Sequence, residues 1–134
     1  MNVHHFGLAT KNMEKSMEAF RTLGFEVGDI IVDPLQKVKV AFVTPPSGSL
    51  IELVCDLDEN GPVGKIVGKV GSSFYHMCFE ADDLEATIEG LRNKKYLLRH
   101  KPIEAVAFNG RRIAWMYNRS IGLVELLEKE KGRG

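Results

Sequence analysis

The sequence predicts an α+β fold in which two tandem β-α-β-β-β modules form one curved mixed sheet with a metal-binding cleft. The first observation behind this prediction is a short apolar strand with a single glutamate in its middle. This strand occurs twice, as Ser49–Val54 around Glu52 and as Gly122–Leu127 around Glu125. A buried carboxylate is costly unless it is paired, protonated or bound to a metal. The repetition therefore indicates a duplicated functional feature.

The second observation is that each module opens with a histidine in a strand. His5 and the residues after it align with His76 and the residues after that one. Further aligned positions are Met17 with Ile88, Phe20 with Leu91, Phe25 with Tyr96, and Val40–Val43 with Ile113–Met116. We interpret residues 1–134 as a single domain of module 1 (residues 1–57) and module 2 (residues 73–128), joined by a Gly-rich linker. One module cannot bury its sheet face alone, so the two should combine.

The elements of module 1 follow from apolar spacing and turn residues. Apolar residues at helical spacing from Met13 to Leu23 predict a helix that Asn12 can cap and Gly24 ends. The expected strands are Val3–Ala9, Phe25–Val32, Lys37–Val43 and Ser49–Val54, separated by polar or proline-containing turns. The linker shows a weak helical pattern at Ile66, Val67 and Val70, which nearby glycines interrupt.

Module 2 repeats this order. A helix with apolar positions Leu84, Ile88 and Leu91 should begin at Asp82 or Asp83. Asn109-Gly110 predicts a tight turn that closes a hairpin. The expected strands are Phe74–Glu80, Tyr96–Leu98, the hairpin arms Val106–Phe108 and Arg112–Tyr117, and Gly122–Leu127. Lys129–Gly134 is expected to be a frayed tail.

Composition narrows the class of protein. Lys plus Arg and Asp plus Glu are both 18, so net charge is zero, which argues against a nucleic-acid partner or a membrane-surface binder. No apolar stretch approaches the roughly 20 residues of a membrane span, and the N-terminus lacks a signal-peptide pattern. Cys55 and Cys78 lack CxxC spacing, so two reduced thiols in a cytoplasmic protein are expected.

Strand alternation places the repeated histidines and glutamates on one face of the sheet. Each has a large apolar neighbour, such as Phe6 beside His5, that suits the helix-covered face. The predicted metal ligands therefore share the cleft: His5, Glu52, His76 and Glu125. Two imidazoles and two carboxylates suit one six-coordinate divalent ion per site, such as Ni, Co, Mn or Fe, better than a tetrahedral structural Zn. Zn stays among the candidates.

The alternative to a metal site is structural. A single strand histidine is more often a core residue, and a single strand glutamate often faces solvent. Both pairs at repeat-equivalent positions favour the metal site. His4 and His100 have no repeat partners, and Cys78 is interpreted as a small residue that lines the cleft.

These residues resemble the vicinal oxygen chelate superfamily, which includes glyoxalase I, methylmalonyl-CoA epimerase, extradiol dioxygenases and antibiotic-sequestering proteins. The resemblance covers essentially the whole chain. Its ordered ligand set is matched by His5, Glu52, His76 and Glu125. The opening strand Val3–Ala9, the linker Gly61–Gly71 and the segment Gly110–Trp115 resemble the epimerase in particular.

The chain also departs from both enzymes. Epimerases usually carry a glutamate after the proline before the third strand, and here Leu35 follows Pro34. Their first-module ligand is commonly glutamine, whereas this chain has Glu52. Glyoxalase I often carries an arginine four residues after the first histidine, where this chain has Ala9. The residues are therefore compatible with either glyoxalase I or the epimerase.

The chemistry expected of such a site is a proton transfer next to a carbonyl. An ion chelated by two neighbouring substrate oxygens stabilises a developing enediolate, which makes the chain a lyase or isomerase. Glu125 is the first candidate for the base and Glu52 the second. An extradiol dioxygenase is disfavoured because it normally uses two histidines and a single glutamate. A non-catalytic resistance-type binding protein is the alternative, although such proteins usually lose the ligand set.

The partners implied are small molecules and a second chain. The substrate would be a thioester or a thiol adduct, and basic residues could anchor an anionic tail such as a CoA phosphate. The basic candidates are Lys37, Lys39, Arg111 and Arg112. We also expect a homodimer, because the modules can pair within one chain or swap between two chains through the same surfaces.

Overall fold

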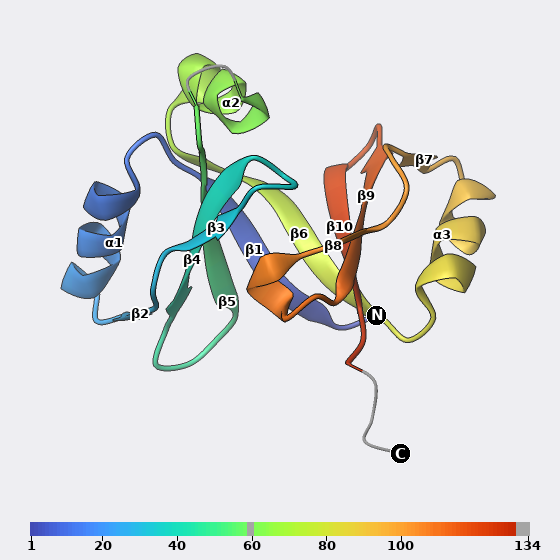
Figure 1. Ribbon diagram of the computed structural model, residues 1–134, viewed down its shortest axis with the longest axis horizontal. Coiled ribbons are helices and arrows are strands. Elements are labelled where there is room, and N and C mark those ends of the chain that lie inside the picture. The colour runs from blue at the N-terminus through green and yellow to red at the C-terminus, as the bar shows by residue number, and fades with distance from the viewer. Residues whose placement is uncertain (59–60, 131–134) are drawn as a thin grey trace. The chain divides into compact units, whose positions relative to one another are not determined.

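The computed structural model describes residues 1–58 and 61–130 (Figure 1). The chain divides into two compact units. One is His5–Tyr75, and the other combines Met1–His4 with His76–Gly134.

The first unit contains most of β1 and a mixed half-sheet. Its strands follow the order β2-β4-β5-β1, in which β4 and β5 are antiparallel and β5 and β1 are parallel. The short β3 pairs with β4. The elements are β1 (Val3–Ala9), α1 (Met13–Thr22), β2 (Glu26–Val27), β3 (Ile31–Asp33), β4 (Val38–Thr44), β5 (Leu50–Asp56) and α2 (Pro62–Val70).

Helix α1 covers one face of this half-sheet (Figure 1). It begins after Asn12, whose Oδ1 accepts the backbone N–H of Lys15 at 3.0 Å, so the orphan donors of the first turn are partly satisfied. Its buried residues Met13 and Met17 pack with Leu53 of β5 and with other apolar residues of β4 and β5. Because alternate residues of a strand point to opposite faces, Glu52 faces away from α1.

The second unit repeats the arrangement. Its strand order is β6-β10-β9-β7, with β6 parallel to β10, β10 antiparallel to β9, and β8 paired with β9. The elements are β6 (Ser73–Ala81), whose first residues belong to the other unit, α3 (Leu84–Arg92), β7 (Leu97–Leu98), β8 (Ile103–Glu104), the 3-10 turn Val106–Phe108, β9 (Arg112–Asn118) and β10 (Gly122–Glu128).

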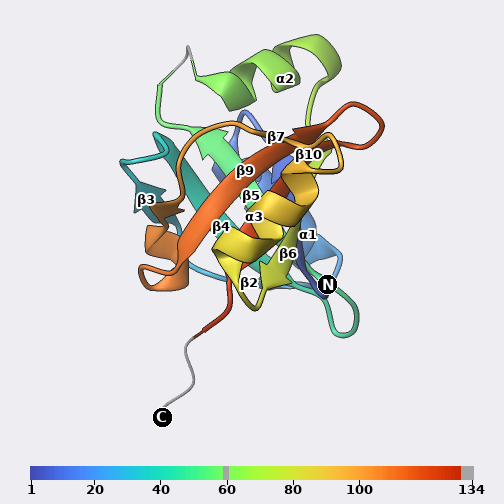
Figure 2. The ribbon, with the colours of Figure 1, turned by 90° about the vertical axis from the view of Figure 1, so that its right-hand side faces the viewer.

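Helix α3 is the counterpart of α1, and Figure 2 shows it lying against the β9 and β10 side of its half-sheet. Asp83, one of the two predicted caps, is its N-cap, because its Oδ1 accepts the Ala86 N–H at 3.0 Å. Leu84 and Ile88 pack with residues of β9 and β10, including Leu126. Glu125, the neighbour of Leu126, therefore faces away from the helix.

The α+β class and the two related modules are confirmed, as is a helix in the linker, α2. The predicted strand Phe25–Val32 is wrong in the middle. It is split into β2 and β3, which pair with different parts of β4. Between them the Gly28 N–H donates to the Phe42 carbonyl at 2.8 Å. A Cβ at Gly28 would lie only 3.2 Å from that oxygen. The absence of a side chain at Gly28 therefore gives the two backbones room to approach each other.

The predicted hairpin arm Val106–Phe108 is also wrong. The Asn-Gly turn forms, with left-handed φ values of 55° at Asn109 and 82° at Gly110. However, the three residues before it make a 3-10 turn, and Ile103–Glu104 pair with β9 instead. Phe108 is not part of a strand. Its side chain is buried and packs against the ring of His4, with a centroid separation of 5.3 Å.

Three simpler expectations can be compared with the structure. Both cysteines are buried thiols. Within residues 1–58 and 61–130, no helix is long and apolar enough to cross a membrane. Lys129 at the start of the expected tail is held, because its N–H donates to the Ala81 carbonyl at 3.0 Å and its Nζ pairs with Asp82 at 3.1 Å. The end of that tail, residues 131–134, lies outside the described residues.

Candidate metal centre

The first unit holds His5 of β1 beside Glu52 of β5. The His5 Nε2 lies 3.6 Å from the Glu52 Oε1, and the two residues are 0% and 5% exposed. Glu52 pairs in register with Gly7 on one side and Phe42 on the other. The Phe42 ring meets the His5 ring edge-on, with centroids 6.0 Å apart. We call this pair, His5 and Glu52, the first half-site.

The second unit holds the equivalent pair, His76 of β6 and Glu125 of β10. Here the His76 Nε2 lies 3.3 Å from the Glu125 Oε1, and the residues are 4% and 2% exposed. Glu125 pairs in register with Cys78 and Trp115. The Trp115 ring meets the His76 ring at 86°, with centroids 4.7 Å apart. We call His76 and Glu125 the second half-site.

Each half-site combines two groups that are costly to bury alone. An ionised carboxylate in an apolar interior is stabilised by a cationic partner or a metal ion, and an imidazole nitrogen is a common ligand of divalent transition metals. One nitrogen and one carboxylate oxygen per half-site fit such an ion chemically. Two ligands are too few for the coordination that these ions adopt in proteins. Either half-site alone therefore requires further ligands.

The structure brings His5 to Glu52 and His76 to Glu125. Arg111 and Arg112, two of the proposed anion anchors, instead engage carboxylates. The Arg111 Nη2 lies 3.1 Å from Glu80. Arg112 contacts Glu85 at 2.6 Å and Glu128 at 2.9 Å. These partners already neutralise much of the arginine charge, so the anchoring role loses support.

The contacts of Arg112 shift two pKa values in the second unit, those of Glu85 and of Arg112 itself. The hydrogen bond from Arg112 is the main cause that lowers the pKa of the Glu85 carboxyl below its ordinary value of 4.5. Hydrogen bonds to Glu128 and Glu85 raise the pKa of the Arg112 guanidinium. In the first unit, burial raises the pKa of the Cys55 thiol, which makes a reactive thiolate at that position unfavourable.

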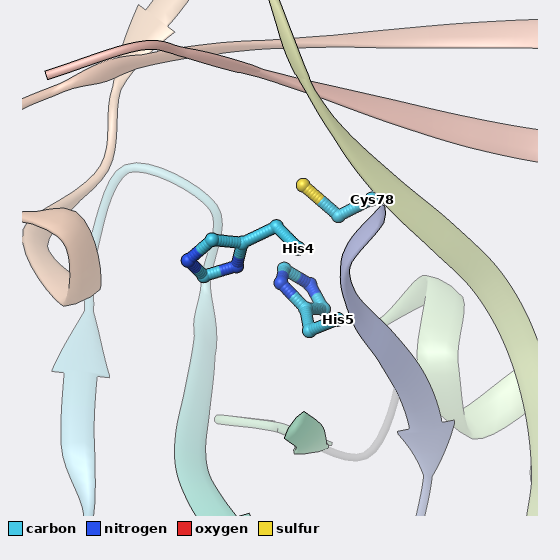
Figure 3. A group of neighbouring side chains, drawn as sticks. All are labelled: His4, His5 and Cys78. Atoms are coloured by element: carbon cyan, nitrogen blue, oxygen red, sulfur yellow. The ribbon is translucent and has the colours of Figure 1, made fainter. Parts of the chain in front are cut away.

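His4, His100 and Cys78 lie outside the two half-sites as defined. Figure 3 shows the side chains of His4 and Cys78, together with His5, the residue that follows His4. A ring nitrogen of His4 lies within 4.8 Å of the Cys78 Sγ. His100 is exposed, and its Nδ1 lies 2.8 Å from the Lys101 carbonyl oxygen.

Sequence reasoning missed the two aromatic residues beside the half-sites, Phe42 and Trp115. Each is the register partner of a half-site glutamate and packs edge-on against the histidine. The repeat contains a signal for them, because Val40–Val43 aligns with Ile113–Met116. In that alignment Phe42 and Trp115 occupy equivalent positions. The alignment alone does not indicate contact with a histidine.

Comparisons with known proteins agree with this architecture. The model of the Glyoxalase/Bleomycin resistance protein/Dioxygenase superfamily matches residues 4–115. The mitochondrial methylmalonyl-CoA epimerase of Mus musculus is 27% identical over 129 residues, which cover 92% of this chain and 71% of that protein.

Two solved structures resemble the whole chain. The methylmalonyl-CoA epimerase of Mycobacterium tuberculosis has a TM-score of 0.83 at 23% identity, covering 96% of this chain and 88% of that one. A variant of the Streptomyces coelicolor methylmalonyl-CoA epimerase, in complex with 2-nitronate-propionyl-CoA, has a TM-score of 0.85 at 24% identity, covering 98% and 99%. At this level of identity the likeness shows the fold.

Proposed function

The chain belongs to the Glyoxalase/Bleomycin resistance protein/Dioxygenase superfamily, and from this premise we propose that it is a divalent-metal-dependent epimerase of the methylmalonyl-CoA epimerase type. The observation that carries the proposal is the pair of buried half-sites at repeat-equivalent positions. The named relatives favour the epimerase over glyoxalase I, two readings that the sequence left open.

We propose that the two half-sites act together on one ion. His5, Glu52, His76 and Glu125 would then hold the ion with two nitrogen and two carboxylate ligands. When bound, the ion supplies Lewis-acid polarisation of the substrate carbonyl. Each half-site alone offers one nitrogen and one oxygen, which are too few ligands for such an ion. An ion shared by the two half-sites explains why the chain has two of them.

The proton transfer itself would belong to the glutamates. Glu125, at 2% exposure the more buried of the two, is our proposed general base at the carbon next to the thioester carbonyl. Glu52 is the second candidate. A base on each side of a planar carbanion allows a proton to leave from one face and return to the other, which is what epimerisation requires.

The proposed substrate is a CoA thioester, because a relative of the same fold binds a CoA thioester analogue. A glutathione adduct has less support, since Ala9 stands where glyoxalase I carries its arginine. The proposed site of action is the cytoplasm, as the sequence predicted. A non-catalytic binding protein of the same family is the alternative.

The test is proton exchange in deuterated water. We expect the purified chain, supplied with Co²⁺ or Ni²⁺, to incorporate solvent deuterium at C2 of methylmalonyl-CoA and to interconvert its epimers. Turnover of the methylglyoxal–glutathione adduct, with no exchange on the thioester, would replace the proposal with glyoxalase I. Tight binding of methylmalonyl-CoA with neither reaction would identify a binding protein.

A further inference from the structure

We propose that Trp115 is a positioning residue that fixes the orientation of the His76 ring in the second half-site. The inference rests on the proposed function only in that His76 serves as a metal ligand. It does not depend on which substrate the protein uses.

The His76 imidazole contacts both the Trp115 ring and the Glu125 carboxylate. Trp115, on β9, is the register partner of Glu125 on β10, and Glu125 is in turn the partner of Cys78, two residues after His76 on β6. The indole and imidazole rings are 4.7 Å apart at 86°, an edge-to-face contact. A partial rotation of the imidazole about its Cβ–Cγ bond would change the 86° angle between the two rings and would also move the His76 Nε2 from its position 3.3 Å from the Glu125 Oε1.

The backbone of Trp115 is itself held on both edges of its strand. It pairs with Glu125 on β10, and its carbonyl accepts the Arg99 N–H at 2.9 Å. The side chains on either side of it in the sequence, Ala114 and Met116, are fully buried under α3. Because its neighbours are anchored on the helix side, the indole is directed to the opposite face, where His76 and Glu125 lie.

The first half-site provides an internal comparison. There the ring opposite the glutamate is Phe42, its centroid lies 6.0 Å from that of His5, and the His5 to Glu52 distance is 3.6 Å. Both distances are longer than in the second half-site. Trp115 should therefore contribute more to metal affinity than Phe42, because a ligand held in its binding orientation loses less freedom when the ion binds.

The test measures Co²⁺ and Ni²⁺ affinity by titration calorimetry in Trp115→Leu, Trp115→Phe and, as the matched control, Phe42→Leu. We expect Trp115→Leu to bind about tenfold more weakly, within the range for residues that orient metal ligands. Trp115→Phe keeps an aromatic face and should lie within about threefold of the unmodified chain. Phe42→Leu should also stay within about threefold, since its ring contact is longer.

The single tryptophan supplies a second readout. A paramagnetic ion bound by His76 lies close to the indole, so Co²⁺ or Ni²⁺ should quench its emission with the midpoint seen by calorimetry. A Trp115→Leu variant that is folded by circular dichroism and binds metal as tightly as the unmodified chain overturns the inference. Equal losses in Trp115→Leu and Phe42→Leu, or metal binding without quenching, overturn it as well.

These outcomes are separable from failure of the proposed function. Metal binding that depends on Trp115, with no exchange on methylmalonyl-CoA, supports the inference and contradicts the epimerase. Deuterium exchange on methylmalonyl-CoA, with the metal affinity of Trp115→Leu unchanged, supports the epimerase and contradicts the inference. Failure of the unmodified chain to bind either ion contradicts both.

Discussion

The two half-site glutamates differ at the level of single residues. Glu125 is slightly more buried than Glu52, and it has a shorter approach to its histidine. It also sits between Val124 and Leu126, both buried in the core under α3. The greater burial and the shorter histidine contact are the reasons for proposing Glu125, ahead of Glu52, as the base.

We expect Glu125→Gln to retain metal while turnover of the thioester falls by about 10²–10⁴, because the amide can still offer an oxygen but cannot accept the proton. Glu52→Gln should be milder. Rates of deuterium exchange, set beside the metal content of each variant, check this. Normal turnover in Glu125→Gln would move the base to another residue and leave Glu125 as a ligand only.

The residues of the half-sites could be predicted from the sequence because a rare feature, a glutamate inside an apolar strand, is repeated. A glutamate inside an apolar strand is unusual once, and its second copy, with a matching histidine, points to a shared role. Trp115 was not readable in this way. An aromatic residue in a β-strand is ordinary, and only the register of β9 against β10 places it opposite Glu125.

Helix α2 shows how an element depends on a distant side chain. The Asp56 carboxylate accepts the backbone N–H groups of Val63 and Gly64 at the N-terminus of the helix. A Cβ on Gly61 would overlap the Asp56 carboxylate, so the residue before the helix must be glycine for the cap to form. Sequence periodicity indicated the helix, although three glycines between residues 64 and 71 made it weak.

Removing this cap should destabilise the protein measurably. We expect Asp56→Ala to lower the free energy of unfolding by about 1 kcal/mol, the usual effect of losing an N-cap side chain. Asp56→Asn keeps an acceptor and should lose less. Urea denaturation compares these variants with Asp29→Ala, which removes an exposed aspartate elsewhere in the same unit. Equal stability of Asp56→Ala and Asp29→Ala would show that the cap contributes nothing.

The contact between Arg112 of β9 and Glu85 at the start of α3 gives a pH-dependent prediction. Because the pKa of Glu85 is lowered, chiefly by the hydrogen bond from Arg112, the stabilisation is present above its ordinary value of 4.5 and lost as pH falls through the lowered value. In an NMR titration, Arg112→Gln should return the Glu85 pKa towards 4.5. An unchanged titration in that variant would assign the shift to another cause.

Errors at the element level had a common origin. The breaks at Gly28 and at the 3-10 turn Val106–Phe108 occur where a short strand pairs with a limited part of its neighbour. Apolar composition predicts a strand over the whole run in both places. Which residues actually enter the ladder depends on the register with β4 and β9, and a single strand's sequence does not contain that information.

For the molecule as a whole, the repeat makes dimerisation an expected outcome. Two modules that can pair within one chain can also exchange partners between chains. We expect sedimentation velocity to show a homodimer at micromolar concentration. A monomer throughout that range would contradict this, and the metal centre would then have to be complete within one chain.

The proposal of one ion shared by two half-sites is tested most directly by metal content. We expect about one divalent ion per chain, measured by mass spectrometry of the purified protein after dialysis. His5→Ala and His76→Ala should each remove it, while His100→Ala, at an exposed histidine outside the half-sites, keeps it. Two ions per chain, or full metal content in both half-site variants, would contradict the shared centre.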